Sequence, residues 1–169
     1  MITKISIWKI NENINNNILY HGSKNKFNKF TIDKEINNPT YNLNNLDHGL
    51  GVFLTDNLTM AKWFAGIIDF NPNTGKYEKT NEIGYVYKVK ANINNPYIIN
   101  EHYTVDIDDA GQTYFNVIEE YGGGKKFREY LLKNEYDSII VNNVTTNYYE
   151  SGDYSIVVIL DTKNAKIIN

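Results

Sequence analysis

The sequence predicts a single α+β domain over residues 1–169, in which many strands are joined by a few helices at irregular intervals. Three observations indicate this class. The chain has the length of one domain and is long enough to bury a substantial core. Strand-like segments outnumber helical ones and do not alternate with them regularly, as a parallel α/β sheet would require. No internal repeat and no linker-like segment divides the chain.

Strands are expected where apolar residues alternate with polar ones or form short runs bounded by turn residues. Residues 85–93 give the clearest case, because Tyr85, Tyr87, Val89 and Ala91 alternate with more polar neighbours. The expected strands cover residues 2–10, 18–22, 49–56, 85–93, 136–141 and 154–160.

Helices are expected where apolar residues recur every three to four positions. These segments are residues 58–68, 114–121 and 125–133, with Asp56 or Asn57 as the N-cap of the first and Gly122 to Gly124 interrupting the other two. Residues 24–45 are expected to be a long loop or a weak helix, and residues 71–81 and 142–152 to be turns or loops.

Composition excludes several classes of site. The formal net charge of −3 and the pI near 5.6 provide no overall attraction to nucleic acid or to an anionic membrane. The chain contains no cysteine, which excludes disulfides and thiolate chemistry and suits a reducing cytoplasm. No apolar run approaches the roughly 18 residues of a membrane span, and no metal-ligand spacing of histidine and carboxylates is evident, so we expect no membrane segment and no metal.

Three short segments combine glycine with histidine, hydroxyl, aromatic or carboxyl side chains. They are Tyr-His-Gly-Ser at residues 20–23, Gly-Leu-Gly-Val-Phe-Leu-Thr-Asp at 49–56 with Ala-Lys-Trp-Phe at 61–64, and Gly-Asp-Tyr-Ser-Ile-Val at 152–157. In order and spacing they resemble the three motifs of the diphtheria-toxin and poly(ADP-ribose) polymerase branch of ADP-ribosyltransferases. The resemblance runs from residue 18 to nearly the C-terminus, and it extends to small prokaryotic and phage-borne members.

The resemblance implies a mixed, mostly antiparallel split β-sandwich with flanking helices, and a site for NAD between its two sheets. The implied activity is transfer of one ADP-ribose unit from NAD to a macromolecule, with release of nicotinamide. The acceptor is expected to be a host protein modified by a bacterial effector, a toxin or a phage-borne enzyme, and a nucleic acid acceptor stays open.

The chemistry explains why such a site needs these residue types. Cleavage of the nicotinamide–ribose bond passes through a transition state resembling an oxocarbenium ion, which negative charge stabilises. The resemblance implies that the backbone of Gly22 grips the carboxamide, that His21 binds ribose hydroxyls, and that Phe53 and Phe64 stack on nicotinamide. Further residues expected at the NAD site are Tyr20, Ser23, Thr55 and, for the pyrophosphate, Lys29 with its neighbours Lys24 and Lys26.

The catalytic carboxylate has two candidates. Asp153 stands where the family has glutamate, directly before the expected strand at 154–160, and Glu150 lies three residues upstream. We favour Asp153 because of its place at the strand. Polymerising members of the family use glutamate here, so transfer of a single unit is expected.

Other functions stay open beside this one. With water as acceptor, the same site would make an NAD glycohydrolase. Phe53, Ala61 and Asp153 depart from the family pattern, so a non-catalytic binding or inhibitor protein on the same scaffold is a further alternative. The branch of the superfamily that uses arginine on its first strand is disfavoured, because the only arginine is Arg128. The charge balance also disfavours an RNA 2′-phosphotransferase.

Overall fold

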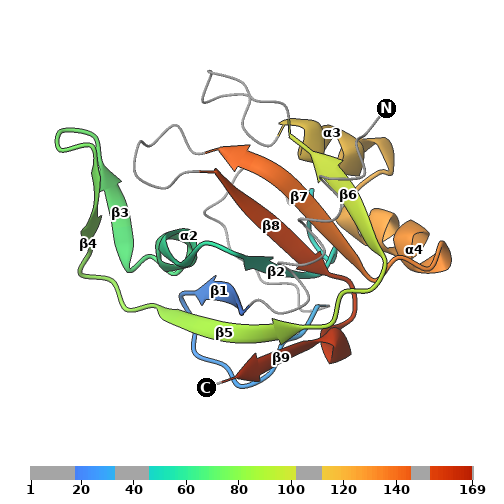
Figure 1. Ribbon diagram of the computed structural model, residues 1–169, viewed down its shortest axis with the longest axis horizontal. Coiled ribbons are helices and arrows are strands. Elements are labelled where there is room, and N and C mark those ends of the chain that lie inside the picture. The colour runs from blue at the N-terminus through green and yellow to red at the C-terminus, as the bar shows by residue number, and fades with distance from the viewer. Residues whose placement is uncertain (1–17, 33–45, 102–111, 146–152, 169) are drawn as a thin grey trace.

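A computed structural model of the chain describes residues 18–32, 46–101, 112–145 and 153–168. Figure 1 shows a mixed α+β arrangement in which one large sheet is flanked by helices and by a small hairpin sheet. In the first part of the chain lie β1 (Leu19–Ser23), β2 (Val52–Thr55), α2 (Leu58–Phe64), β3 (Ile68–Asn71), β4 (Lys76–Lys79), β5 (Tyr85–Ala91) and β6 (Pro96–Asn100). The second part contains α3 (Gln112–Glu120), α4 (Gly124–Lys133), β7 (Ser138–Thr145), β8 (Asp153–Ile159), the 3-10 helix η2 (Thr162–Asn164) and β9 (Ala165–Ile168).

The large sheet has the strand order β6-β7-β8-β2-β1-β5-β9. All neighbours pair antiparallel except β6 and β7, which are parallel. The junction between β2 and β1 is narrow, because only Tyr20 and Thr55 are in register there. By contrast, β1 pairs with β5 over five positions and β2 pairs with β8 over four. The sheet therefore consists of two well-laddered groups of strands joined by one register pair.

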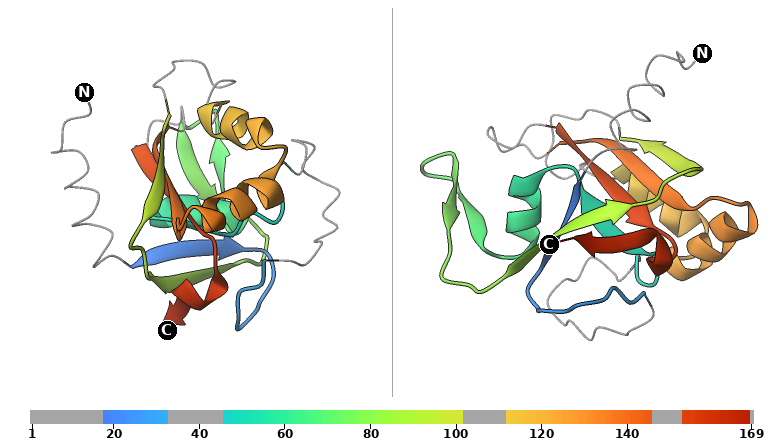
Figure 2. Two further views of the ribbon diagram at one scale, coloured as in Figure 1. Left: turned by 90° about the vertical axis from the view of Figure 1, so that its right-hand side faces the viewer. Right: turned by 60° about the horizontal axis from the view of Figure 1, so that its bottom comes forward.

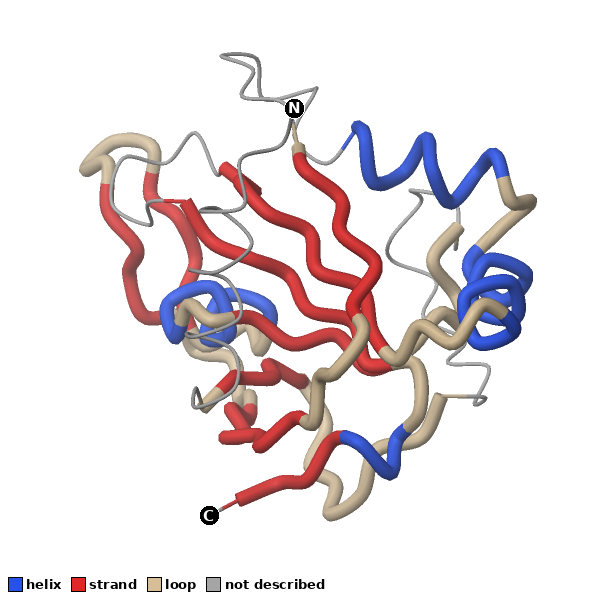
Figure 3. Tube along the Cα trace, turned by 45° about the vertical axis from the view of Figure 1, so that its right-hand side comes forward, coloured by secondary structure: helices blue, strands red, loops and turns tan. Residues whose placement is uncertain are grey.

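Two apolar clusters occupy the two faces of this sheet, and β8 contributes to both. Tyr154 and Val158 belong to the cluster that α3 and α4 cover, whereas Val157 and Ile159 belong to the cluster around β1 and β5. Side chains alternate between the faces of a strand, so a strand buried on both faces reads as a continuous apolar run. Figures 2 and 3 show α3 and α4 together on one side of the sheet.

Glu101 joins the end of β6 to the start of α3. Its carboxylate is buried and accepts hydrogen bonds from the backbone N–H groups of Thr113 (3.2 Å) and Tyr114 (2.8 Å). The first N–H groups of a helix lack partners within the helix, and a carboxylate at this end also complements the helix dipole. Glu101 therefore acts as a long-range cap for α3.

The expected helix at 58–68 is too long, because α2 ends at Phe64. Ala65 is its C-cap, and Gly66 follows with φ of 73°, a backbone conformation that glycine adopts without strain. Ile68 then starts β3. Apolar residues with helical spacing therefore continue past the last residue of the helix. Of the two candidate N-caps, Asn57 has this role, since its side chain accepts from Thr59 N and Met60 N.

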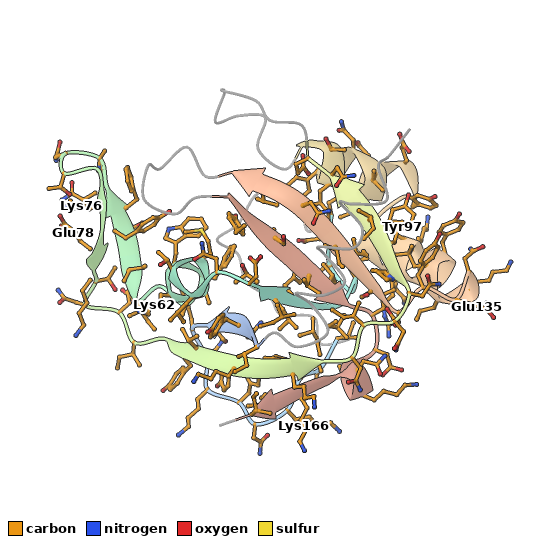
Figure 4. All side chains as sticks on the ribbon, viewed as in Figure 1. Lys62, Lys76, Glu78, Tyr97, Glu135 and Lys166 are labelled. Carbon is orange, nitrogen blue, oxygen red and sulfur yellow. The ribbon has the colours of Figure 1, made fainter. Side chains whose placement is uncertain are left out.

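Two expected loops are partly strand. Residues 76–79 form β4, which pairs with β3, and residues 142–145 extend β7. Figure 4 shows Lys76 and Glu78 projecting from the β3–β4 hairpin beside α2. Hydrogen bonds from Asn71 and Thr74 hold Glu78 and lower the pKa of its carboxyl group. A short polar strand such as β4 has no apolar pattern in the sequence, so it is recognised only by its pairing with β3.

The other segments agree with the sequence to within a few residues, apart from two strands that the sequence did not reveal. The strands expected at 18–22, 49–56, 85–93, 136–141 and 154–160 and the helices at 114–121 and 125–133 are confirmed with shifted ends. The two missed strands are β6, which pairs with β7, and β9, which pairs with β5. Both pairings join residues that are distant in the chain. Residues 24–32 contain neither helix nor strand, and the expected strand at 2–10 lies outside the described residues. Among the described helices, none has the length and apolar character required to cross a membrane.

Candidate functional site

The three segments singled out in the sequence lie next to one another in the sheet. They form β1, the turn and strand leading into α2, and β8, and the strand order places β2 between β8 and β1 (Figure 1). Phe53 is in register with Val158 on one side, and Thr55 with Tyr20 on the other. Residues from the two ends of the described chain are thereby brought within one strand's width of β2.

His21 connects the two groups of strands with its side chain. Its Nδ1 lies 2.7 Å from the carbonyl oxygen of Phe53, across the narrow junction between β1 and β2. A carbonyl oxygen only accepts, so we assign the proton of the neutral ring to Nδ1, which leaves Nε2 as an acceptor. Burial lowers the pKa of His21, and the bond to Phe53 opposes this shift only in part. His21 is therefore neutral at pH 7.

Aromatic side chains enclose the ring of His21. Phe27 and Phe30 approach it edge to face, with ring centroids at 5.5 and 5.2 Å. Phe27 in turn stacks on Tyr87 of β5 at 4.3 Å, and its backbone N–H donates to the Tyr87 hydroxyl. The segment that follows β1 thus folds back over His21 and buries its ring. This burial is the main cause of the lowered pKa of His21.

Gly22 lies against helix α2. A Cβ atom at this position would be 2.0 Å from the carbonyl oxygen of Ala61 and 2.8 Å from the backbone nitrogen of Ala65. Gly84 meets the same helix, because its Cβ would be 2.1 Å from the carbonyl oxygen of Ala65. The backbone of α2 and its C-cap therefore packs directly against two glycines. At Gly22, the missing side chain allows helix α2 to approach strand β1.

The remaining residues expected on the first segment lie at the end of β1 and in the segment that follows it. Ser23 Oγ accepts from the backbone N–H of Asn25 at 3.1 Å, forming a turn at the end of β1. Tyr20 is half-buried at the strand junction. Lys29 is exposed in the segment after β1, and the end of the Lys24 side chain, Cε with Nζ, lies beside Gly66 just after α2.

Thr55 and the two phenylalanines lie on β2 and α2. Thr55 is 3% exposed, and its hydroxyl accepts from the N–H of Asn57, so it shapes the turn into α2. Phe53 is partly buried against the first apolar cluster, whereas Phe64 is 44% exposed and touches the ring of Trp63. Phe64 therefore ends α2 as an exposed aromatic surface and not as a core residue.

Asp153 opens β8, where it is in register with Thr145 of β7. Glu150 lies outside the described residues. Asp56 is the carboxylate that the structure adds beside this strand, since its Oδ1 accepts from the N–H of Ser155 at 2.9 Å. Tyr154, which lies between Asp153 and Ser155 in the chain, is buried. Burial, together with the nearby Tyr77 and Asp56, raises the pKa of its hydroxyl group to about 12.

Sequence reasoning missed Asp56, Gly84 and the phenylalanines over His21. The sequence places Asp56 at the end of the second motif and offers it as an alternative helix cap, but it does not reveal the bond to β8. The presence of Asn57 beside it is a signal that one of the two is available for another role. Phe27 and Phe30 stand in an otherwise polar segment, which is a recognisable sign of burial. For Gly84 the only signal is its place directly before the clearest strand.

Comparisons with protein-family models, with curated proteins and with solved structures gave no match. Within the residues that the structure describes, histidines and carboxylates form no group of three or more arranged to hold a metal ion. The case for a function consequently depends on the site itself.

Proposed function

We propose that this protein is an NAD-consuming mono-ADP-ribosyltransferase, which transfers ADP-ribose from NAD to a macromolecular acceptor and releases nicotinamide. The acceptor is a host protein, and the enzyme acts as a phage-borne or bacterial effector in the cytoplasm of that host. One observation carries the proposal: three segments far apart in the sequence, each resembling a motif of this family, lie side by side as β1, β2 with α2, and β8.

His21 supports this function through its protonation state. A neutral ring with its proton on Nδ1 has Nε2 available to accept a hydrogen bond from a ribose hydroxyl. Because burial keeps the ring neutral, it adds no positive charge beside a ribose that itself becomes positive in the transition state. The bond to Phe53 fixes the orientation of the ring before substrate arrives.

The nicotinamide would lie near Gly22. β1 pairs with β5 along its whole length but is laddered to β2 only at Tyr20, so beyond this pair the edge of β1 toward β2 is the part suited to bind a carboxamide. Helix α2, seated directly on Gly22, supplies Phe64 as an exposed ring, and β2 supplies Phe53. Both rings would favour a planar, cationic nicotinamide through π contacts.

The carboxylate that stabilises the developing cation is Asp153 in this proposal, with Glu150 as the rival. As the bond between C1′ of the ribose and the nicotinamide nitrogen breaks, its electron pair leaves with nicotinamide. The acceptor nucleophile then bonds to C1′ and releases its proton to the solvent. Asp153 opens β8 three residues before Ile156, which is in register with Thr55 at the end of β2, so its carboxylate would act beyond the end of that strand. The finer fold assignment, a split β-sandwich, belongs to the same proposal and is supported by the single register pair between β1 and β2.

Labelled NAD tests the proposal. The protein is incubated with NAD labelled in the adenine part, with and without a bacterial lysate, and nicotinamide release and labelled macromolecules are measured. Nicotinamide together with a labelled macromolecule supports the transferase, and His21→Ala and Asp153→Ala should both lose the label. If only Glu150→Ala loses it, the carboxylate assignment is wrong. Nicotinamide release without any label indicates an NAD glycohydrolase.

A non-catalytic NAD-binding protein is the second candidate, favoured by one observation at α2. Ala61, which stands where some family members have a serine that contacts the carboxamide, is fully buried with its carbonyl oxygen against Gly22. An increase of the melting temperature with NAD but no nicotinamide release would support this candidate. Absence of both effects would refute the enzymatic and the binding proposals together.

A further inference from the structure

Asp56 lies at the point where β2 ends and β8 continues. The ladder between these strands runs from Val52 and Ile159 to Thr55 and Ile156 and stops there. The first residues of β8, Asp153 to Ser155, extend beyond it. On this side, the N–H of Ser155 donates to Oδ1 of Asp56 at 2.9 Å.

The carboxylate of Asp56 thus continues the ladder in place of a backbone carbonyl group. In a β ladder, the position of a residue is fixed by hydrogen bonds to the strands on both sides. On its other side the start of β8 pairs with β7, but the register shifts between Val141 and Val144, directly before the pairs with Tyr154 and Asp153. Such an irregularity bends the strand and re-aims its side chains.

Among the described residues, it is Asn57 and not Asp56 that caps α2. The N-cap of that helix is Asn57, whose side chain accepts from Thr59 N and Met60 N. The turn before the helix is closed by the Thr55 hydroxyl, which accepts from Asn57 N. These contacts direct Asn57 toward the helix and leave Asp56 bonded to β8.

We infer that Asp56 is a positioning residue, which fixes the start of β8 and thereby the place of Asp153 relative to β2 and β1. This inference rests on the proposed function, because Asp153 is the carboxylate assigned there. Asp56 acts through the backbone at Ser155 and does not itself touch NAD. Small displacements of a catalytic group are costly, so loss of this bond lowers the rate more than it weakens NAD binding.

Three variants test the inference. Asp56→Ala removes the acceptor, whereas Asp56→Asn keeps an oxygen acceptor of the same size. Asp161→Ala is the matched control, because Asp161 also accepts a backbone N–H through its carboxylate (from Lys163 at 3.0 Å) and lies just beyond the other end of β8.

Hydrogen exchange of the Ser155 amide, measured by NMR, reports the bond itself. In Asp56→Ala the exchange should accelerate about tenfold, the factor that corresponds to one ordinary hydrogen bond. Asp56→Asn and Asp161→Ala should exchange like the wild type at this amide. An unchanged rate in Asp56→Ala would overturn the inference without bearing on the activity.

The kinetics of nicotinamide release show whether Asp56 positions Asp153 for the reaction. We expect kcat of Asp56→Ala to fall on the order of 10- to 100-fold with little change of KM for NAD, and Asp56→Asn to recover most of the rate. Faster exchange at Ser155 with an unchanged kcat would overturn the positioning role and leave the proposed function standing. If the wild type releases no nicotinamide, the proposed function fails and the positioning role fails with it, while the exchange data still show whether Asp56 holds the strand.

Discussion

Replacing Gly22 with alanine should displace helix α2 from strand β1. The new Cβ atom would lie 2.0 Å from the carbonyl oxygen of Ala61, whereas ordinary contact begins at 3.4 Å, so the helix must move by about 1.4 Å. Both close neighbours are backbone atoms, which no side-chain rotation can relieve. Overpacking typically costs 1–3 kcal/mol, and a contact with rigid backbone belongs at the upper end, at about 3 kcal/mol or more.

Thermal unfolding measures this cost. In a domain of this size each kcal/mol lowers the melting temperature by roughly 2–4 °C, so Gly22→Ala should lower it by roughly 6–12 °C. Gly75→Ala is the matched control, because nothing lies within 4 Å of its Cβ and only the strain of a φ of 69° remains. That strain costs about 1 kcal/mol.

The two variants together decide the argument. If Gly22→Ala melts within about 2 °C of Gly75→Ala, the close seating of α2 on β1 is refuted. Gly84→Ala offers an independent check at the end of the helix, since its Cβ would be 2.1 Å from the carbonyl oxygen of Ala65. Its loss of stability should resemble that of Gly22→Ala.

Two further predictions concern a buried carboxylate and the histidine. Glu101→Ala leaves two backbone N–H groups of α3 without their acceptor, and should cost about 3 kcal/mol in chemical denaturation, whereas Glu101→Gln should lose less because it keeps an oxygen acceptor; equal losses would contradict the capping role. The pKa of His21 in the folded state lies below its ordinary value of 6.5, so the unfolded chain binds the proton more readily. The stability that the neutral ring contributes is therefore complete above pH 6.5. It is lost as the pH falls from there toward the folded-state pKa. The melting temperature of His21→Gln should consequently fall less between pH 8 and about pH 5 than that of the wild type, and parallel curves would contradict the lowered pKa.

The sequence by itself determined where the main elements lie. Alternation at residues 85–93 and the continuous apolar run at 156–160 are local patterns, and each follows from how a strand exposes its two faces. The helices of residues 114–121 and 125–133 follow from periodicity in the same way. The sequence also indicated that Gly22 and the neighbouring His21 are special, through the segment in which they stand.

Only the tertiary structure decided which residues of the site meet and why. The Asn57 side chain caps α2 and Asp56 bonds to β8, a division that two adjacent polar residues do not reveal, because it depends on a strand 99 residues away. The strands β6 and β9 likewise depend on partners distant in the chain. Gly22 is the clearest case: the sequence marked the glycine, and the packing of α2 upon it supplied the reason, since a missing Cβ has consequences only where another backbone comes close.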